Sequence, residues 1–278
     1  MQKLSVADWF IQSVSQPCAR RMTEKLCARI FQILAALYLS GMFFPAHADT
    51  IRVAVAANVQ YVFDDLRRAF KAESGHELQP IFNSSGKLAA QILLGAPFDV
   101  FLSADMALPE RLYIEGKAVT QPRIYAQGLL VLWTTKDLDL THWQQLLTST
   151  SIQRIAVANP RLAPYGEQSM KLLQTLQLDQ SLKAKLVFGE SIAQTNQYIH
   201  SGVADLGLTA KSVVMSAQMA GQGRWISLPQ DAYTPIAQGA VVLAYGQQHH
   251  RLAAQAFYQF MFGAKARAIL TQAGYAVP

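Results

Sequence analysis

The sequence predicts an α/β fold of two lobes, each a mainly parallel sheet flanked by helices. Short apolar segments alternate with amphipathic segments of helical period along residues 51–272, as in sheets whose parallel strands are connected by helices. The roughly 230 residues that follow an N-terminal leader suit two smaller lobes, with one larger sheet as the alternative. Polar loops at strand-to-helix junctions occur in both halves, which favours two lobes around a shared cleft.

The leader, residues 1–48, has the features of a signal peptide. A basic region at 20–29 precedes an apolar run at 30–44, which is too short to span a bilayer comfortably, since a span needs about 20 residues. A small-residue Ala-x-Ala motif at 46–48 marks the expected cleavage point. Met22 is an alternative start of translation. We therefore expect an exported protein whose mature chain begins at residue 49.

Composition excludes several functional classes. Both cysteines, Cys18 and Cys27, lie in the leader, so the mature chain has no disulfide, no thiol nucleophile and no cysteine ligand for a metal. The leader also carries five Lys/Arg and two Asp/Glu, and its removal lowers the formal net charge from +6 to +3. No basic block remains, so nucleic acid is not an expected partner.

The first half of the mature chain alternates strands and helices. Residues 51–57 are apolar and predict a strand, and the helix predicted at 59–72 places Val62, Leu66 and Phe70 on one face. The other elements expected here are a strand at 77–82, a helix at 87–94, a buried strand at 99–103 and a helix at 107–115.

The second half continues the alternation. It predicts strands at 129–134 and 155–158, a helix at 167–176, a strand at 185–188, a helix at 193–200 and a strand at 206–209. The C-terminal part adds a strand at 239–245 and helices at 251–262 and 264–272.

Four junction loops, each placed just before a helix, are the candidate site. They are Ala56-Ala57-Asn58, Asn83-Ser84-Ser85-Gly86, Ala163-Pro164-Tyr165-Gly166 and Glu190-Ser191-Ile192. A helix start offers unpaired backbone N–H groups and the positive end of a dipole, so such a loop can bind an anion. Taken singly, each loop is equally well explained by helix capping or a tight turn. Together they predict an oxyanion site in the cleft between the lobes.

Other chemistry has less support. Lys87 follows a glycine, but Ile81 and Leu88 break the pattern of a phosphate-binding loop. Asp99 and Asp105 are expected to be structural caps, and the histidines show no metal-ligand spacing. A secreted hydrolase that uses Ser85 or Ser103 remains an alternative, although no nucleophile-elbow motif is present.

Three segments carry a resemblance to a known family. Residues 53–58, 82–89 and 95–105 resemble the periplasmic molybdate-binding proteins of ABC transporters, and the segment Gly-Ala-Pro-Phe-Asp-Val-Phe-Leu-Ser-Ala-Asp is the most specific match. The resemblance implies a class II periplasmic binding protein fold, a periplasmic location and no enzymatic activity. It implies two crossings between lobes, near 127–129 and 235–238. Lobe 1 would comprise 49–128 with 238–278, and lobe 2 would comprise 129–237.

The resemblance also implies the ligand and its contacts. Asn58, Ser85, Tyr165 and Ile192 would contact the oxygens of molybdate or tungstate, with no direct protein–metal bond and no further cofactor. Some members of the family have a binding Tyr where this chain has Ala210, and the Tyr165 hydroxyl would supply the missing donor from the opposite lobe, facing an open cleft. The expected partner is a membrane ABC permease, and the protein is expected to be a monomer.

Another oxyanion, such as sulfate or thiosulfate, is the alternative ligand. Molybdate and tungstate are larger than sulfate, so a rigid set of donors can distinguish them by fit. Phosphate carries a proton at neutral pH and needs a buried acceptor, whereas the loops at Asn58, Ser85 and Tyr165 contain no acid before their helices begin. The sequence therefore favours a fully deprotonated dianion.

Overall fold

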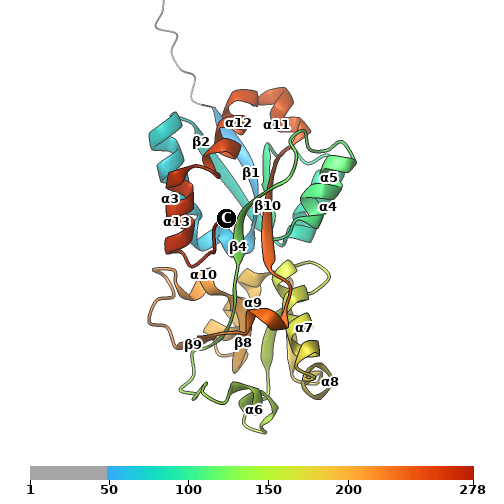
Figure 1. Cartoon of the computed structure of the whole chain (residues 1–278), viewed down its shortest axis with the longest axis vertical. Helices are drawn as coiled ribbons and strands as arrows, with labels where there is room; N and C mark the ends of the chain where they lie inside the picture. Colours follow the sequence, from blue (N-terminus) through green and yellow to red (C-terminus); the bar gives the residue numbers. More distant parts are fainter. Residues whose placement is uncertain (1–48) are drawn as a thin grey trace, which may run out of the picture. The chain divides into compact units, whose positions relative to one another are not determined.

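The computed structural model describes residues 49–278, and the predicted leader at 1–48 lies outside the described residues. The described chain contains two five-stranded sheets with helices packed on them (Figure 1). The predicted fold class, two lobes that are each an α/β sheet flanked by helices, is confirmed. Within residues 49–278, none of the helices has the length and apolar character that a membrane span requires.

The first sheet has the strand order β2–β1–β3–β10–β4. Its strands are β1 (Thr50–Ala56), β2 (Glu77–Asn83), β3 (Val100–Leu102), β4 (Arg123–Gly128) and β10 (Ile236–Val242). β1 pairs in parallel with β2 and β3, whereas β10 pairs antiparallel with β3 and β4. Four strands therefore run in one direction and β10 runs in the opposite direction. Two of the four strand pairings are parallel and two are antiparallel.

Helices cover both faces of this sheet. They are α3 (Gln60–Ser74), α4 (Ser85–Leu93), α5 (Ala107–Ile114), α11 (Ala244–His249), α12 (Arg251–Phe260) and α13 (Ala264–Gln272). Side chains of β1 alternate between two cores: Val53 and Val55 pack with α3 and α12, and Ala54 packs with α4 and α5. This alternation follows from the two-residue period of a strand whose two faces are both covered.

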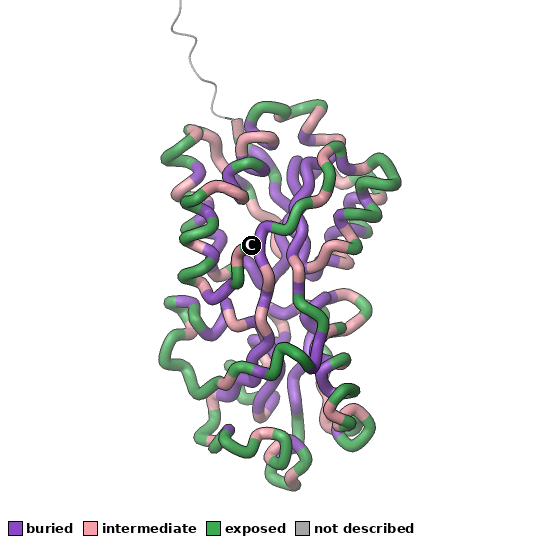
Figure 2. The backbone as a smooth tube through the Cα atoms, viewed as in Figure 1, coloured by how far each residue is buried: buried purple, intermediate pink, exposed green. Residues whose placement is uncertain are grey.

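The second sheet has the order β7–β6–β8–β5–β9. Its strands are β5 (Leu130–Thr134), β6 (Ile155–Ala158), β7 (Leu186–Gly189), β8 (Leu206–Ala210) and β9 (Arg224–Ser227). Its helices are α6 (Trp143–Thr148), α7 (Pro164–Thr175), α8 (Asp179–Leu182), α9 (Ile192–His200) and α10 (Lys211–Val214). Here β5 is the reversed strand, paired antiparallel with β8 and β9. In Figure 2 the inner strands, such as β6 and β8, belong to the buried interior, whereas the edge strand β9 is mostly exposed.

Two neighbouring strands carry the chain between the sheets. β4 ends at Gly128 and β5 begins at Leu130, and the chain returns to the first sheet at Ile236 in β10. β4 and β10 are paired, with Ile236 opposite Gly128, so both connections lie side by side. The lobe limits themselves, 49–128 with 238–278 and 129–237, remain a prediction.

Some elements differ from the sequence prediction. The strand expected at 239–245 is displaced, because β10 spans Ile236–Val242 and α11 already begins at Ala244. β4 and β9 were not predicted, nor were the short helices α6, α8, α10 and α11. β4 contains Arg123 and Gln127 among its six residues, so it lacks the continuous apolar run that identified the other strands.

Candidate functional site

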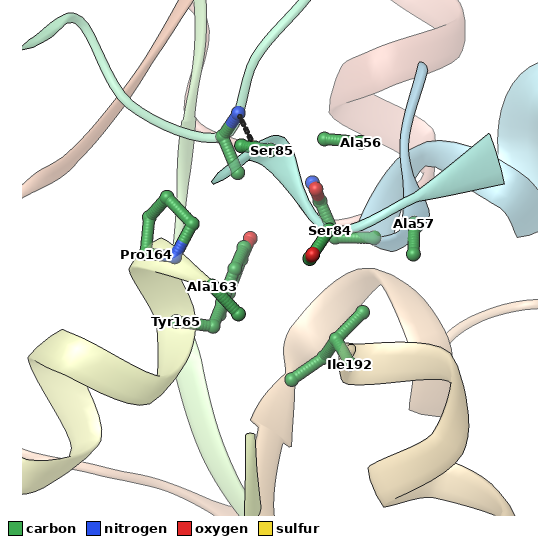
Figure 3. Close-up of a pocket in the computed structure, with 10 residues that line it drawn as sticks. Ala56, Ala57, Ser84, Ser85, Ala163, Pro164, Tyr165 and Ile192 are labelled. Atoms are coloured by element: carbon green, nitrogen blue, oxygen red, sulfur yellow. Dashed lines mark hydrogen bonds between the residues drawn. The ribbon is translucent and has the colours of Figure 1, made fainter. Parts of the chain in front are cut away.

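A pocket lies where strands of both sheets end and helices begin (Figure 3). Its walls come from the segments after β1, β2, β3, β6 and β7, which is the strand end where open α/β sheets bind ligands. The ten residues that line it are Ala56, Ala57, Asn58, Ser84, Ser85, Ala104, Ala163, Pro164, Tyr165 and Ile192. All four residues that the sequence predicted for the site are therefore brought to one pocket.

Ser85 and Ser84 come from the loop between β2 and α4. Ser85 begins α4, and its Oγ accepts a hydrogen bond from the backbone N–H of Ala104 at 2.9 Å (the dashed line in Figure 3). That bond leaves the Ser85 hydroxyl proton free to be donated. Ser84 is 3% exposed, and its Oγ has no hydrogen-bond partner among the described residues. Because an unpaired buried hydroxyl is costly, Ser84 offers the pocket a second free donor. The sequence placed Ser84 in a candidate loop but named only Ser85 as a contact.

Asn58 is held by hydrogen bonds to other parts of the first sheet. It lies in a 3₁₀ turn, Ala57–Val59, and is 1% exposed. Its Nδ2 donates to Gln238 Oε1 at 2.9 Å and to the Tyr275 hydroxyl at 3.0 Å, which uses both hydrogens of the amide. Asn58 was predicted to donate to the ligand. In this structure the donor that it has left is its backbone N–H.

Tyr165 is the second residue of α7 and is 2% exposed. Its hydroxyl oxygen accepts a hydrogen bond from Gln238 Nε2 at 3.0 Å. A Cβ atom on Gly128 would lie 2.0 Å from that oxygen, so only glycine fits at the end of β4. The hydroxyl is therefore packed against the connection between the sheets and does not face open solvent, contrary to the sequence expectation. Burial raises the pKa of Tyr165 well above its usual value, so the hydroxyl stays protonated and can donate.

Ile192 closes the pocket from the second sheet. It begins α9, directly after Ser191, whose Oγ accepts from the Gln194 N–H at 3.3 Å and caps the helix. The Ile192 side chain is 3% exposed and forms part of the apolar wall. Its backbone N–H is at the first position of the helix, where no intrahelical acceptor exists.

Three helix starts thus converge on the pocket. The backbone N–H groups of Ser85, Tyr165 and Ile192 lie in the first turns of α4, α7 and α9, and within residues 49–278 none of the three has a hydrogen-bond acceptor. The positive ends of three helix dipoles add to these donors. The arrangement can bind an anion without any cationic side chain.

The pocket is small, lined by buried residues and free of charged side chains. Its volume, for the centre of a water molecule, is about 10 Å³, which is room for about one water molecule. The two sides of the pocket are in direct contact, since the Gly86 N–H in α4 donates to the carbonyl oxygen of Leu162, between β6 and α7, at 3.0 Å. Since pockets for drug-sized ligands measure roughly 300–1,000 Å³, this one excludes a ligand of that size.

Other candidate residues lie outside the pocket. Ser103 Oγ donates to Asp105 Oδ1 at 3.2 Å and does not line the site. No histidine lines it either, so Ser85 lacks the imidazole base that would activate it as a hydrolase nucleophile. Ala210 is buried at the end of β8 and also does not line the pocket. Among residues 49–278 no group of three or more His, Cys, Asp or Glu is placed to hold a metal ion.

Gln238 and Tyr275 were missed by sequence reasoning, although both contact site residues. A signal was present for Gln238, which is a polar residue inside the otherwise apolar segment Ile-Ala-Gln-Gly-Ala-Val-Val of β10. Tyr275 offered no such signal, because the contact joins positions 217 residues apart.

Comparisons with known proteins agree with this geometry. Residues 51–276 match the family model described as bacterial extracellular solute-binding protein. The chain is 37% identical to the molybdate-binding protein ModA of Azotobacter vinelandii over 246 residues, which cover 88% of this chain and 96% of the relative. It is 36% identical to ModA of Rhodobacter capsulatus over 242 residues, covering 87% and 94%.

Solved structures give the same result. The periplasmic molybdate-binding protein of A. vinelandii superposes with a TM-score of 0.77 at 34% identity, over 82% of this chain and 99% of that one. The sulfate-binding protein SubI of Mycobacterium tuberculosis superposes with a TM-score of 0.69 at 17% identity, over 82% and 86%. The second similarity supports the fold alone.

Proposed function

Because the chain belongs to the bacterial extracellular solute-binding proteins, the family of the molybdate-binding relatives that it resembles, we propose that it captures molybdate, and also tungstate, and delivers it to a membrane ABC permease. The protein is a binding protein and not an enzyme. Asn58, Ser85, Tyr165 and Ile192, with Ser84, are the proposed contacts to the oxygens of the ion. We further propose that it acts as a monomer in the periplasm after removal of residues 1–48.

The observation that carries the proposal is a small buried pocket with neutral donors from both sheets. Three hydroxyls, those of Ser84, Ser85 and Tyr165, line it together with free amides in the first turns of α4, α7 and α9. A hydrogen bond to a charged group contributes about 1.5–3 kcal/mol. Several such bonds can offset the desolvation of a dianion and leave the roughly 8 kcal/mol of micromolar binding.

The same lining favours a fully deprotonated ion. No carboxylate lines the pocket, and the nearby acid Glu190 is engaged in an ion pair with Lys87. A protonated anion such as hydrogen phosphate would therefore bury its O–H without a carboxylate acceptor, which costs free energy. The small volume also disfavours an organic anion.

Calorimetry with sodium molybdate on residues 49–278 tests the proposal. We expect one site per chain with micromolar or tighter affinity, and a similar affinity for tungstate. Millimolar or absent binding of both would overturn it. Sulfate or thiosulfate titrated in parallel tests the alternative ligand, and sulfate binding as tight as molybdate binding would replace molybdate in the proposal.

A further inference from the structure

Gln238 connects the two sides of the pocket without lining it. It lies in β10, the strand that returns the chain to the first sheet, and it is 0% exposed. Its Oε1 accepts from Asn58 Nδ2 at 2.9 Å and from the Tyr125 hydroxyl at 2.8 Å. Its Nε2 donates to the Tyr165 hydroxyl at 3.0 Å. One buried amide thus contacts a residue after β1 and a residue at the start of α7.

The direction of these bonds decides what Tyr165 can do. A phenol has one proton, and its oxygen accepts as well as donates. Gln238 Nε2 is only a donor, so it occupies the oxygen of Tyr165 and cannot take the proton. Among residues 49–278 that proton has no acceptor. Since the Tyr165 hydroxyl lies at the pocket (Figure 3), the proton is available to an anion there.

Asn58 is oriented by the same amide. Gln238 Oε1 and the Tyr275 hydroxyl take both hydrogens of Asn58 Nδ2, and the Tyr275 hydroxyl also donates to the Asn58 carbonyl at 2.9 Å. The amide hydrogens and the carbonyl of Asn58 are therefore already engaged within the protein. The backbone N–H of Asn58, in the 3₁₀ turn Ala57–Val59, is the donor that remains.

We infer that Gln238 is a positioning residue of the oxyanion site, which fixes the Tyr165 hydroxyl so that its proton is donated to the ligand and holds Asn58 in place. This inference rests on the proposed function. A purely structural Gln238, whose amide only satisfies buried neighbours, predicts a change in stability with no change in ligand affinity. The two cases therefore differ in a measurable way.

The Gln238→Glu variant tests the direction of the Tyr165 bond, because it keeps the shape of the side chain and removes its only donor. A carboxylate there accepts the Tyr165 proton and places a negative charge beside the dianion. Binding then requires uptake of one proton. We expect affinity for molybdate at least about tenfold weaker at pH 7, with further weakening as pH rises from 6.5 to 8.5, by up to about tenfold per pH unit.

Few other groups near Gln238 can titrate in this range. Tyr125 and Tyr165 contact it from β4 and α7, and Tyr275 is hydrogen-bonded to its neighbour Asn58. Burial raises the pKa of each of these tyrosines. Burial also raises the pKa of the Asp105 carboxyl, which acts on Tyr125 through space. The wild-type profile, measured in parallel, removes any contribution from these groups, and we expect it to be flat.

Gln127→Glu is the matched control. Gln127 lies in the paired strand β4, next to Ala126, which is the residue opposite Gln238, so its side chain points to the other face of the sheet. This variant adds the same charge to the same connection without touching Tyr165. We expect wild-type affinity and a flat pH profile.

A second variant, Gln238→Met, removes the amide without adding charge. Combined with Tyr165→Phe in a double-mutant cycle on molybdate affinity, it measures whether the two residues act as one unit. We expect each single variant to lose about tenfold to a hundredfold, and the double variant to lose no more than the larger single loss. The melting temperature of each ligand-free variant is recorded alongside.

Each outcome decides one claim. Absent molybdate binding by the wild type overturns the proposed function and the inference with it. If the wild type binds, wild-type affinity with a flat profile in Gln238→Glu overturns the inference alone. If Gln238→Glu does not fold, the cycle decides, and additive losses there overturn the inference. A pH-dependent loss in Gln238→Glu, or non-additive losses in the cycle, support it.

Discussion

Lys87 and Glu190 form an ion pair that joins the two sides of the pocket. Lys87 is in the first turn of α4 and Glu190 precedes α9, and Lys87 Nζ lies 2.5 Å from Glu190 Oε2. The side chains are 34% and 66% exposed. An exposed pair of this kind contributes about 0–1 kcal/mol. The pair can therefore help to hold α4 and α9 together, but it contributes only a small part of the free energy of that contact.

Lys87→Gln is expected to weaken molybdate binding by less than about fivefold, because only this partly exposed pair is lost. The loss should shrink as salt is raised, since salt screens exposed charges. Calorimetry at low and high ionic strength measures both effects. Lys183→Gln removes the same charge from the end of α8, outside the pocket, and should bind as the wild type does. A hundredfold loss in Lys87→Gln would instead make Lys87 a direct contact of the ion.

Tyr165→Phe is expected to lower molybdate affinity by about tenfold to a hundredfold, because one hydrogen bond to a charged ligand is lost. It should also lower the ligand-free free energy of unfolding by about 1–3 kcal/mol, because Gln238 Nε2 loses its buried acceptor. Tyr233→Phe is the matched control, since the Tyr233 hydroxyl accepts from the Leu130 N–H at 3.2 Å and does not line the pocket. It should alter stability alone, and equal affinities of Tyr165→Phe and wild type would contradict the proposed contact.

Ser84→Ala is expected to weaken molybdate binding without destabilising the ligand-free protein. The Ser84 hydroxyl is buried without a partner in the described chain, so its removal should leave the ligand-free melting temperature unchanged or raise it. Molybdate affinity should nevertheless fall by about tenfold or more. Ser85→Ala is the comparison, because it also removes the acceptor of the Ala104 N–H and should lose both affinity and stability. Unchanged affinity in Ser84→Ala would remove Ser84 from the contacts.

Alkaline pH is expected to lower the free energy of unfolding. Burial raises the pKa of Tyr275 to about 12 and raises those of Tyr125 and Tyr165 well above the usual value. These phenols stay protonated in the folded state while unfolded tyrosines ionise near pH 10, so the stability is complete below pH 10 and falls as pH rises toward 12. Thermal melts from pH 7 to 11 measure this, and a melting temperature that is constant through pH 11 would contradict it.

Much of the fold could be predicted because its inner strands are buried on both faces. β1 and β6 have continuous apolar runs, and α3 has apolar residues at helical spacing. β4 and β9 were not predicted because each carries polar residues and depends on pairing with a strand distant in sequence. Such pairing is a tertiary effect that local patterns do not encode.

The candidate site also has a part that the sequence predicts and a part that it does not. Ser85 and Ile192 could be located because helix starts have a local sequence signature, and the structure places both at the first position of a helix. The partners of Asn58 could not be predicted, since Gln238 lies 180 residues away. The role of each predicted residue in binding stays a prediction until the ligand is titrated.

The strand order of the first sheet has a consequence for the order of folding. Its central strand β3 is paired on one side with β1 and on the other with β10, which begins at Ile236. The second sheet is drawn from one continuous stretch, Leu130 to Ser227. During synthesis from the N-terminus, the strands of the second sheet are all available before β10 is made. Until then β3 has an unpaired edge, because its partner β10 begins more than a hundred residues later. Long-range pairing of this kind is slow and exposes sheet edges to aggregation, so chaperone dependence should be greatest for the N-terminal third of the described chain.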